Sequence, residues 1–195
     1  MAESKFDQAE RVQPDSVDEW ATWLDGNHAT STGVWLVMWK KATGRQVVTY
    51  EVAVIEALRF GWVDSLARAL DAERSMLWFS PRKPGSGWSR PNKERIAKLE
   101  GDGRMHPAGD AVLAAARADG SWTLLDDVEA LVVPPDLEAA FARHPGARDR
   151  WDGFPRSARR AILEWIVQAK RPETRQRRID ETAERAARGE RANNQ

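Results

Sequence analysis

Six consecutive apolar residues, Val34–Trp39, constrain the fold more than any other part of the sequence. Because neighbouring side chains of a strand point to opposite faces, a run that is apolar at every position predicts a strand buried on both faces. We therefore expect residues 33–41 to form a central strand of a sheet. Trp39, inside this run, is expected to be fully buried.

Helical and strand patterns surround this run within the first 90 residues. Apolar residues at helical spacing predict helices at 16–26 and 49–60, each followed or ended by a glycine. Two stretches, 62–71 and 76–79, are separated by a short polar turn and predict a hairpin. The loop at 80–90 is expected to close this sheet-containing part.

The remainder of the chain has a helical pattern throughout, because prolines and glycines divide it into short segments with helical spacing. The expected helices span residues 91–100, 107–118, 136–143, 147–152, 157–170 and 172–188. We therefore predict an α+β fold class: a small N-terminal sheet with packed helices, followed by an all-helical C-terminal half. We divide the chain into an α+β part, 1–90, and a helical part, 91–195. The two parts are expected to share one core in a single compact domain, with a flexible tail from about residue 189.

Composition narrows the compartment and the chemistry. The chain has 195 residues and no cysteine, which excludes disulfides, thiolate metal ligands and cysteine nucleophiles and fits a reducing cytosol. No apolar run approaches the length of a membrane span, and the first residues lack the apolar segment of a signal peptide. The sequence therefore predicts a cytoplasmic protein without a membrane segment, and it leaves the oligomeric state open.

Acidic and basic residues are segregated along the chain although the formal net charge is zero. Residues 1–32 carry seven acids against two bases, and residues 100–138 carry nine acids against two bases. Residues 78–98 hold six bases to one acid, and residues 156–178 hold eight bases to two acids. Such blocks either neutralise one another and solvate the surface, or mark surfaces for charged partners.

The basic stretch at 80–95 is the main candidate binding surface. It is punctuated by prolines and glycines, and it combines cations, backbone donors and one tryptophan, which suits an anion, a nucleic acid or an acidic peptide. No apolar period surrounds Trp88, so we expect it either to stack on a ligand or to fold back as a plug over the core. The candidate residues are Arg82, Lys83, Trp88, Arg90, Asn92, Lys93 and Arg95.

Two smaller groups are secondary candidates. Asp64 and Ser65, next to Trp62, could frame a small-molecule pocket, but without a histidine base they form no triad, and hydrogen bonding within a turn is the alternative. Arg175 and Arg178 could clamp phosphates or carboxylates, or they could pair with acidic residues one or two turns further along the same helix.

Metal and cofactor sites are not indicated. The histidines His28, His106 and His144 lie far apart, and no pair has the helical spacing of metal ligands. The glycine motifs that bind nucleotide phosphates are absent. We therefore predict no metal and no cofactor, and we leave open whether the protein is an enzyme, favouring a non-enzymatic one.

Seven segments together carry a resemblance to a known family, among them Glu56-Ala-Leu-Arg-Phe-Gly-Trp-Val-Asp-Ser65 and Ala169-Lys-Arg-Pro-Glu-Thr-Arg175. The others are residues 34–41, 79–89, 92–95, 103–109 and 133–138. In this order and spacing, nearly the whole chain resembles the bacterial YdeI/OmpD-associated (OmdA-like, bacteriocin-protection) family. The resemblance implies a stress-response role in resistance to bacteriocins or antimicrobial peptides, and it implies no catalytic residue.

Three functions remain as hypotheses. The first is a cytoplasmic binding or stress-protection protein whose basic stretch holds an acidic ligand or peptide. The second is a nucleic-acid-binding module that uses residues 80–95 together with the C-terminal arginines, and it requires both on one face. The third is a small-molecule enzyme with a pocket near Asp64 and Ser65. A cationic antimicrobial peptide, the ligand that the resemblance suggests, would instead need the acidic blocks at 1–32 or 100–138.

Overall fold

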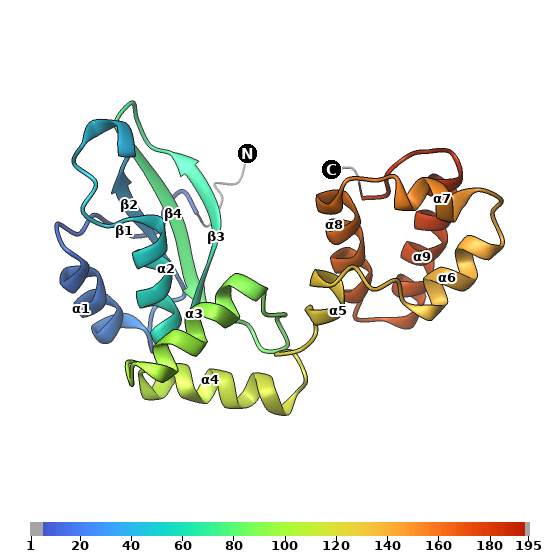
Figure 1. Cartoon of the computed structure of the whole chain (residues 1–195). Helices are drawn as coiled ribbons and strands as arrows, with labels where there is room; N and C mark the ends of the chain where they lie inside the picture. Colours follow the sequence, from blue (N-terminus) through green and yellow to red (C-terminus); the bar gives the residue numbers. More distant parts are fainter. Residues whose placement is uncertain (1–5, 194–195) are drawn as a thin grey trace. The chain divides into compact units, whose positions relative to one another are not determined.

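The computed structural model describes residues 6–193, and their contacts form two compact units (Figure 1). The first unit contains residues up to 86 together with 91–121, and the second contains 87–90 and 122 onward. The first unit holds a four-stranded sheet with helices, and the second holds helices only, so the predicted fold class is confirmed. The division at residue 90 and the shared core stay predictions.

The sheet of the first unit has the strand order β1-β2-β4-β3. Its strands are β1 (Arg11–Val12), β2 (Val34–Trp39), β3 (Trp62–Ala69) and β4 (Arg74–Pro81). Strand β2 pairs in parallel with β1 and antiparallel with β4, which confirms its predicted central position. The hairpin of β3 and β4 is also confirmed, although β4 starts earlier and ends later than expected. The two-residue β1 is too short to leave a periodic signal in the sequence.

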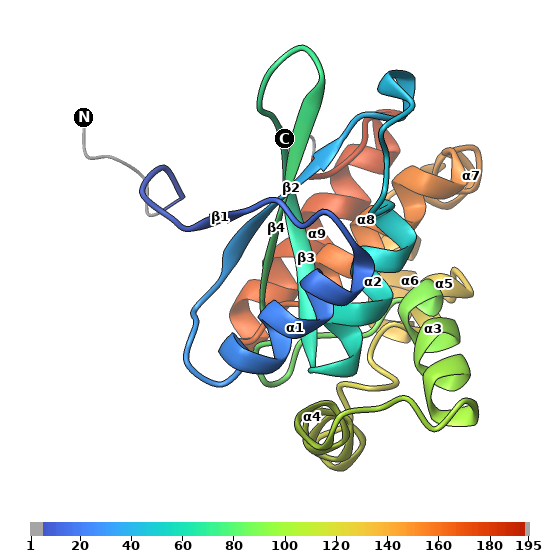
Figure 2. The same ribbon diagram turned by 90° about the vertical axis from the view of Figure 1, so that its left-hand side faces the viewer.

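Helices α1 (Val17–Asn27) and α2 (Tyr50–Arg59) lie side by side against one face of the sheet (Figure 2). Trp20 of α1 is fully buried, donates its indole N–H to the carbonyl oxygen of Ala53 at 3.1 Å, and packs against Phe79 of β4. A short 3-10 helix η1 (Lys41–Thr43) precedes α2. The unit is completed by α3 (Arg90–Gly101) and α4 (Pro107–Ala118).

The opposite face of the sheet is covered by the N-terminal segment. Trp35 and Trp78, paired across β2 and β4, form a small cluster there with partly buried Phe6 and Ala9. The Trp35 indole N–H donates to the carbonyl oxygen of Phe6 at 2.7 Å, and Arg68 lies 5.3 Å from the Trp35 ring. Both faces of β2 are therefore covered, as the apolar run predicts, but by different kinds of structure.

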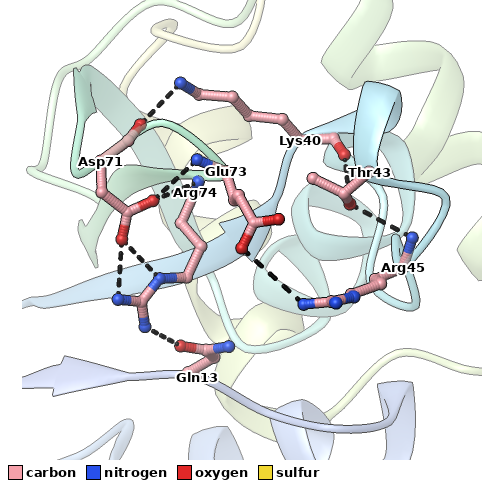
Figure 3. A network of polar contacts seen from close by, with 7 residues as sticks. All are labelled: Gln13, Lys40, Thr43, Arg45, Asp71, Glu73 and Arg74. Carbon is pink, nitrogen blue, oxygen red and sulfur yellow. Dashed lines mark hydrogen bonds and ion pairs between the residues drawn. The ribbon is translucent and has the colours of Figure 1, made fainter.

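Polar contacts hold the tip of the β3–β4 hairpin (Figure 3). Lys40 donates from Nζ to the carbonyl oxygens of Asp71 and Ala72 at 2.7 and 3.1 Å, and Arg74 binds the Asp71 carboxylate and the Gln13 amide oxygen. The expectation that Trp39 is fully buried is wrong. Trp39 is the last residue of β2 and is only partly buried, with Arg45 and Arg74 at 5.1 and 5.7 Å from its ring.

The second unit packs five helices around its own core: α5 (Asp126–Glu129), α6 (Pro135–Ala142), α7 (Ala147–Asp152), α8 (Arg156–Val167) and α9 (Pro172–Ala187). Ile162 and Ile166 of α8 are buried as their spacing predicts, against Ile179 and Ala183 of α9. Helix α5, a single acidic turn, is not among the helices expected from the sequence. Helix α9 ends at Ala187, and of the tail predicted to be flexible, residues 194–195 lie outside the described part.

Candidate functional site

Trp88 is buried in the second unit, with an exposed fraction of 1%. Its ring lies 5.2 Å from that of Trp122, and a side chain on the neighbouring Gly87 would come within 2.7 Å of Leu125. Glycine is therefore required where this segment approaches Leu125. This geometry agrees with the expectation that Trp88 folds back over the core, because neither face of its ring is open to stack on a ligand.

Two of the main candidates, Arg95 and Asn92, meet in the first unit. Arg95 binds both carboxylate oxygens of Glu51, donates to the Asn92 side-chain oxygen at 2.8 Å, and lies 5.9 Å from the Tyr50 ring. The hydrogen bond from Arg95 lowers the pKa of Glu51 against a small opposing effect of burial. The Arg95 charge is thus largely committed to the protein itself.

Asp64 and Arg82 lie close to this cluster. The Tyr50 hydroxyl donates to Asp64 at 3.1 Å; burial, followed by the Asp64 charge, raises the pKa of Tyr50. Burial lowers the pKa of Arg82 to about 10, although the Asp64 charge opposes this. Ser65 is exposed and falls where the register between β3 and β4 shifts. Asp64 therefore has a structural partner, and Ser65 is not part of a hydrogen-bonded pair with it.

The remaining candidates in the first 95 residues do not form one cluster. Trp62 is buried and donates its indole N–H to the carbonyl oxygen of His28 at 3.3 Å, so it acts as a core residue. Lys83 and Arg90 are exposed, and Lys93 is partly buried. Arg90 belongs to the second unit by its contacts, where its charge helps Arg160 to lower the pKa of Glu129.

The C-terminal arginines bind groups on neighbouring helices instead of acids further along α9. Arg175 makes two hydrogen bonds to Asp136 of α6, at 2.8 and 3.0 Å. Burial alone would raise the pKa of Asp136, but these bonds outweigh it and the pKa is lowered. Arg178 donates to the carbonyl oxygen of Trp165 and lies 4.8 Å from its ring. Both cations therefore hold α9 to its neighbours.

A shallow surface that is mostly open to solvent follows the exposed side of α9 and is lined by residues of this helix alone; we call it the acidic groove. Four carboxylates and one arginine line it, so the lining carries a formal charge of about −3 at neutral pH. Its residues are Pro172, Glu173, Gln176, Arg177, Asp180, Glu181 and Glu184.

Two carboxylates of the groove are uncommitted. Asp180 pairs with Arg143, and Glu181 pairs with Arg185. Within residues 6–193, the Glu173 and Glu184 side chains make no hydrogen bond or ion pair with another group. This acidic surface was not predicted from the sequence, because residues 156–178 count as one basic block; in the structure Arg160, Arg175 and Arg178 of that block bind groups on other helices.

His28 and His106 are closer together than their positions in the sequence suggested. The rings of His28 and His106 are 4.9 Å apart, and His106 accepts a hydrogen bond on Nδ1 from the backbone of Ala108 at 3.1 Å. Its other nitrogen lies 3.7 Å from Asp25. Among the described residues, no group of three or more histidine, aspartate or glutamate side chains could hold a metal ion.

Two family models match different parts of the chain. The model described as "Domain of unknown function (DUF8412)" matches residues 12–112, and that described as "Bacteriocin-protection, YdeI or OmpD-Associated" (OmdA) matches residues 130–189. The expected resemblance to the YdeI/OmpD-associated family is thus confirmed, but only for the helical unit. The matched segment is shorter than the expectation, which covered nearly the whole chain. No curated protein and no solved structure matches significantly. Within the described part of the chain, no helix is both long and apolar enough to cross a membrane.

Proposed function

Because the chain belongs to the DUF8412 family and carries an OmdA domain, named for bacteriocin protection, we propose that it is a non-enzymatic binding protein that protects against bacteriocins or antimicrobial peptides by binding cationic peptides. The binding surface in this proposal is the acidic groove of α9. We also propose a cytoplasmic location, which is supported by a chain that folds without cysteine.

The observation that carries the proposal is the pair of uncommitted carboxylates, Glu173 and Glu184, in an open groove inside the OmdA domain. Glu173 lies in the first turn of α9, where the helix dipole also favours a negative charge, so this residue has a structural role as well. Glu184 lies three turns later and has no such role. Two carboxylates separated along one helix suit a ligand with several positive charges better than a single small cation.

The other hypotheses have less support from the local geometry. An acidic ligand or nucleic acid needs available cations, whereas Arg95 is held by Glu51 and Arg175 by Asp136. The single-face requirement of the nucleic-acid hypothesis stays a prediction. An enzyme built on Asp64 and Ser65 also stays a prediction, with Asp64 bonded to Tyr50.

Fluorescence anisotropy of a labelled octalysine peptide tests the proposal. We expect saturable binding to the full chain that weakens at higher salt, because screening reduces attraction between exposed charges. Replacing both Glu173→Gln and Glu184→Gln should weaken binding about fivefold, as expected for two exposed charge pairs.

The matched control replaces Glu94→Gln and Asp102→Asn, two exposed acids of the first unit, and removes the same charge. Equal weakening by both double variants would mean that only net charge matters and would contradict a site on α9. Absence of octalysine binding would overturn the proposed function. In bacteria challenged with a cationic bacteriocin, expression of the chain should raise survival more than expression of the groove variant.

A further inference from the structure

A second cavity in the helical unit shares the first turn of α9 with the acidic groove. It has a volume of about 240 Å³, and Arg175 lines it while Glu173 and Gln176 line the groove. Most of its wall is apolar. The full lining is Leu124, Asp127, Val128, Val132, Pro134, Pro135, Leu163, Ile166, Val167 and Arg175.

Backbone hydrogen bonds fix the loop that forms one side of this cavity. The N–H of Val132 donates to the carbonyl oxygen of Asp127 at 2.8 Å, and that of Leu131 donates to Val128 at 3.1 Å. Leu131 adopts a φ of 58°, which is unusual for a residue with a branched side chain. Val132, the next residue, is 49% exposed.

The size of the cavity indicates what could occupy it. An apolar cavity of about 150 Å³ is enough to bind benzene, so 240 Å³ admits a phenyl or branched aliphatic group. Pockets for whole drug-sized ligands or cofactors span roughly 300–1,000 Å³. The cavity therefore fits one apolar side chain of a larger ligand better than a complete small molecule.

Charges around the cavity favour a basic neighbour for that side chain. The Arg175 guanidinium is neutralised by two hydrogen bonds to Asp136. The exposed Asp127 carboxylate makes no hydrogen bond or ion pair with any described residue, and the groove on the other side of the turn adds Glu173. A ligand here meets an apolar wall bordered by uncommitted negative charge.

We propose that this cavity is an anchor site for one large apolar side chain of a cationic, amphipathic peptide, whose basic residues pair with Asp127 and the α9 groove. This inference rests on the proposed function and deepens it. It makes the protein selective for peptides that combine positive charge with an aromatic or branched residue, instead of for any polycation.

Two labelled peptides test the anchor, each with seven lysines and one central residue, phenylalanine or alanine. The full chain should bind the phenylalanine peptide about tenfold more tightly, as expected for partial burial of one aromatic side chain. Val132→Trp should block the mouth of the cavity and abolish this preference without changing affinity for the alanine peptide. Val47→Trp, at a comparably exposed valine of the first unit, is the control and should preserve the preference.

A measurement without the peptide separates the anchor from the groove. N-acetylphenylalanine amide should cause saturable shifts in the methyl NMR signals of Val128, Leu163 and Ile166, and leave those of Val34 and Leu36 in the first unit unchanged. Equal affinity for the two peptides, or no methyl shifts, would overturn the anchor site while leaving the proposed function intact. Methyl shifts without binding of either peptide would show that the cavity admits an aromatic group, but would overturn binding of cationic peptides and with it the anchor.

Discussion

Gly109 of α4 faces the carbonyl oxygen of Arg59, the last residue of α2, so closely that no side chain fits between them. A β-carbon at this position would approach the Arg59 oxygen well within 3.0 Å, the distance below which something must shift. The backbone N–H of His106, just before α4, donates to the same oxygen at 3.2 Å. The start of α4 is thus fixed against the end of α2 by backbone contact.

Gly109→Ala should therefore destabilise the first unit by about 1–3 kcal/mol, the usual cost of overpacking a tight contact. Urea denaturation measures this. Gly101→Ala is the control, because Gly101 ends α3 with open space around it and alanine there should be neutral or slightly stabilising. Equal stabilities of the two variants would show that α4 can move away from α2 at little cost.

Trp39→Ala should cost about 1–2 kcal/mol, because Trp39 is partly exposed and loses two cation–π contacts of modest strength. Trp35→Ala, at a fully buried position of the same strand, should cost about 3–5 kcal/mol. Equilibrium denaturation of both variants gives the comparison. If Trp39→Ala lowered the free energy of unfolding more than Trp35→Ala does, the burial described for the two ends of β2 would be contradicted.

Trp88→Ala should destabilise the second unit by about 3–5 kcal/mol, as expected for removal of a buried indole. Hydrogen exchange followed by mass spectrometry can assign the loss of protection to residues 122–187. A Trp88→Ala protein that is as stable as the parent, but binds a ligand less well, would instead favour the stacking alternative.

Glu129 should stabilise the second unit at neutral pH and lose this effect at acid pH. Hydrogen bonds from Arg160 lower its pKa in the folded state, although burial opposes them, so the stabilisation is present above the unfolded value near 4.5 and is lost as pH falls through the lower folded value. Glu129→Gln should cost about 1 kcal/mol at pH 7 and almost nothing at pH 2.

Urea denaturation at both pH values measures this loss, with Glu94→Gln as an exposed control that should have no effect at either pH. A gap between Glu129→Gln and the parent that is the same at both pH values would show that the stabilisation does not depend on the Glu129 charge.

The central strand could be predicted because its signal is local: an apolar run at every position has few structural solutions. The depth of Trp39 could not, because burial at the last position of a strand depends on how far the covering segments extend. Trp165 is likewise only partly buried, because it packs against the core while Arg178, thirteen residues later, lies over its ring.

The candidate site was less predictable because its charges are decided by partners distant in sequence. Arg175 pairs with Asp136, 39 residues away, although Glu173 and Asp180 lie much nearer along the chain. Glu173 and Glu184 stay uncommitted, which local spacing does not reveal either. The surroundings of Trp88 include Trp122, and those of His28 include His106, so neither environment can be predicted from neighbouring residues in the sequence.

The short strand β1 is expected to protect the protein from self-association. Its residues Arg11 and Val12 occupy the outer edge of β2, and Phe6 and Ala9 lie over the tryptophans of the adjoining face. A chain shortened to begin after Val12 would leave β2 with unpaired backbone groups beside bare indole rings. Such an edge can recruit a strand of another molecule, so the truncated protein is expected to aggregate at concentrations where the parent remains dispersed.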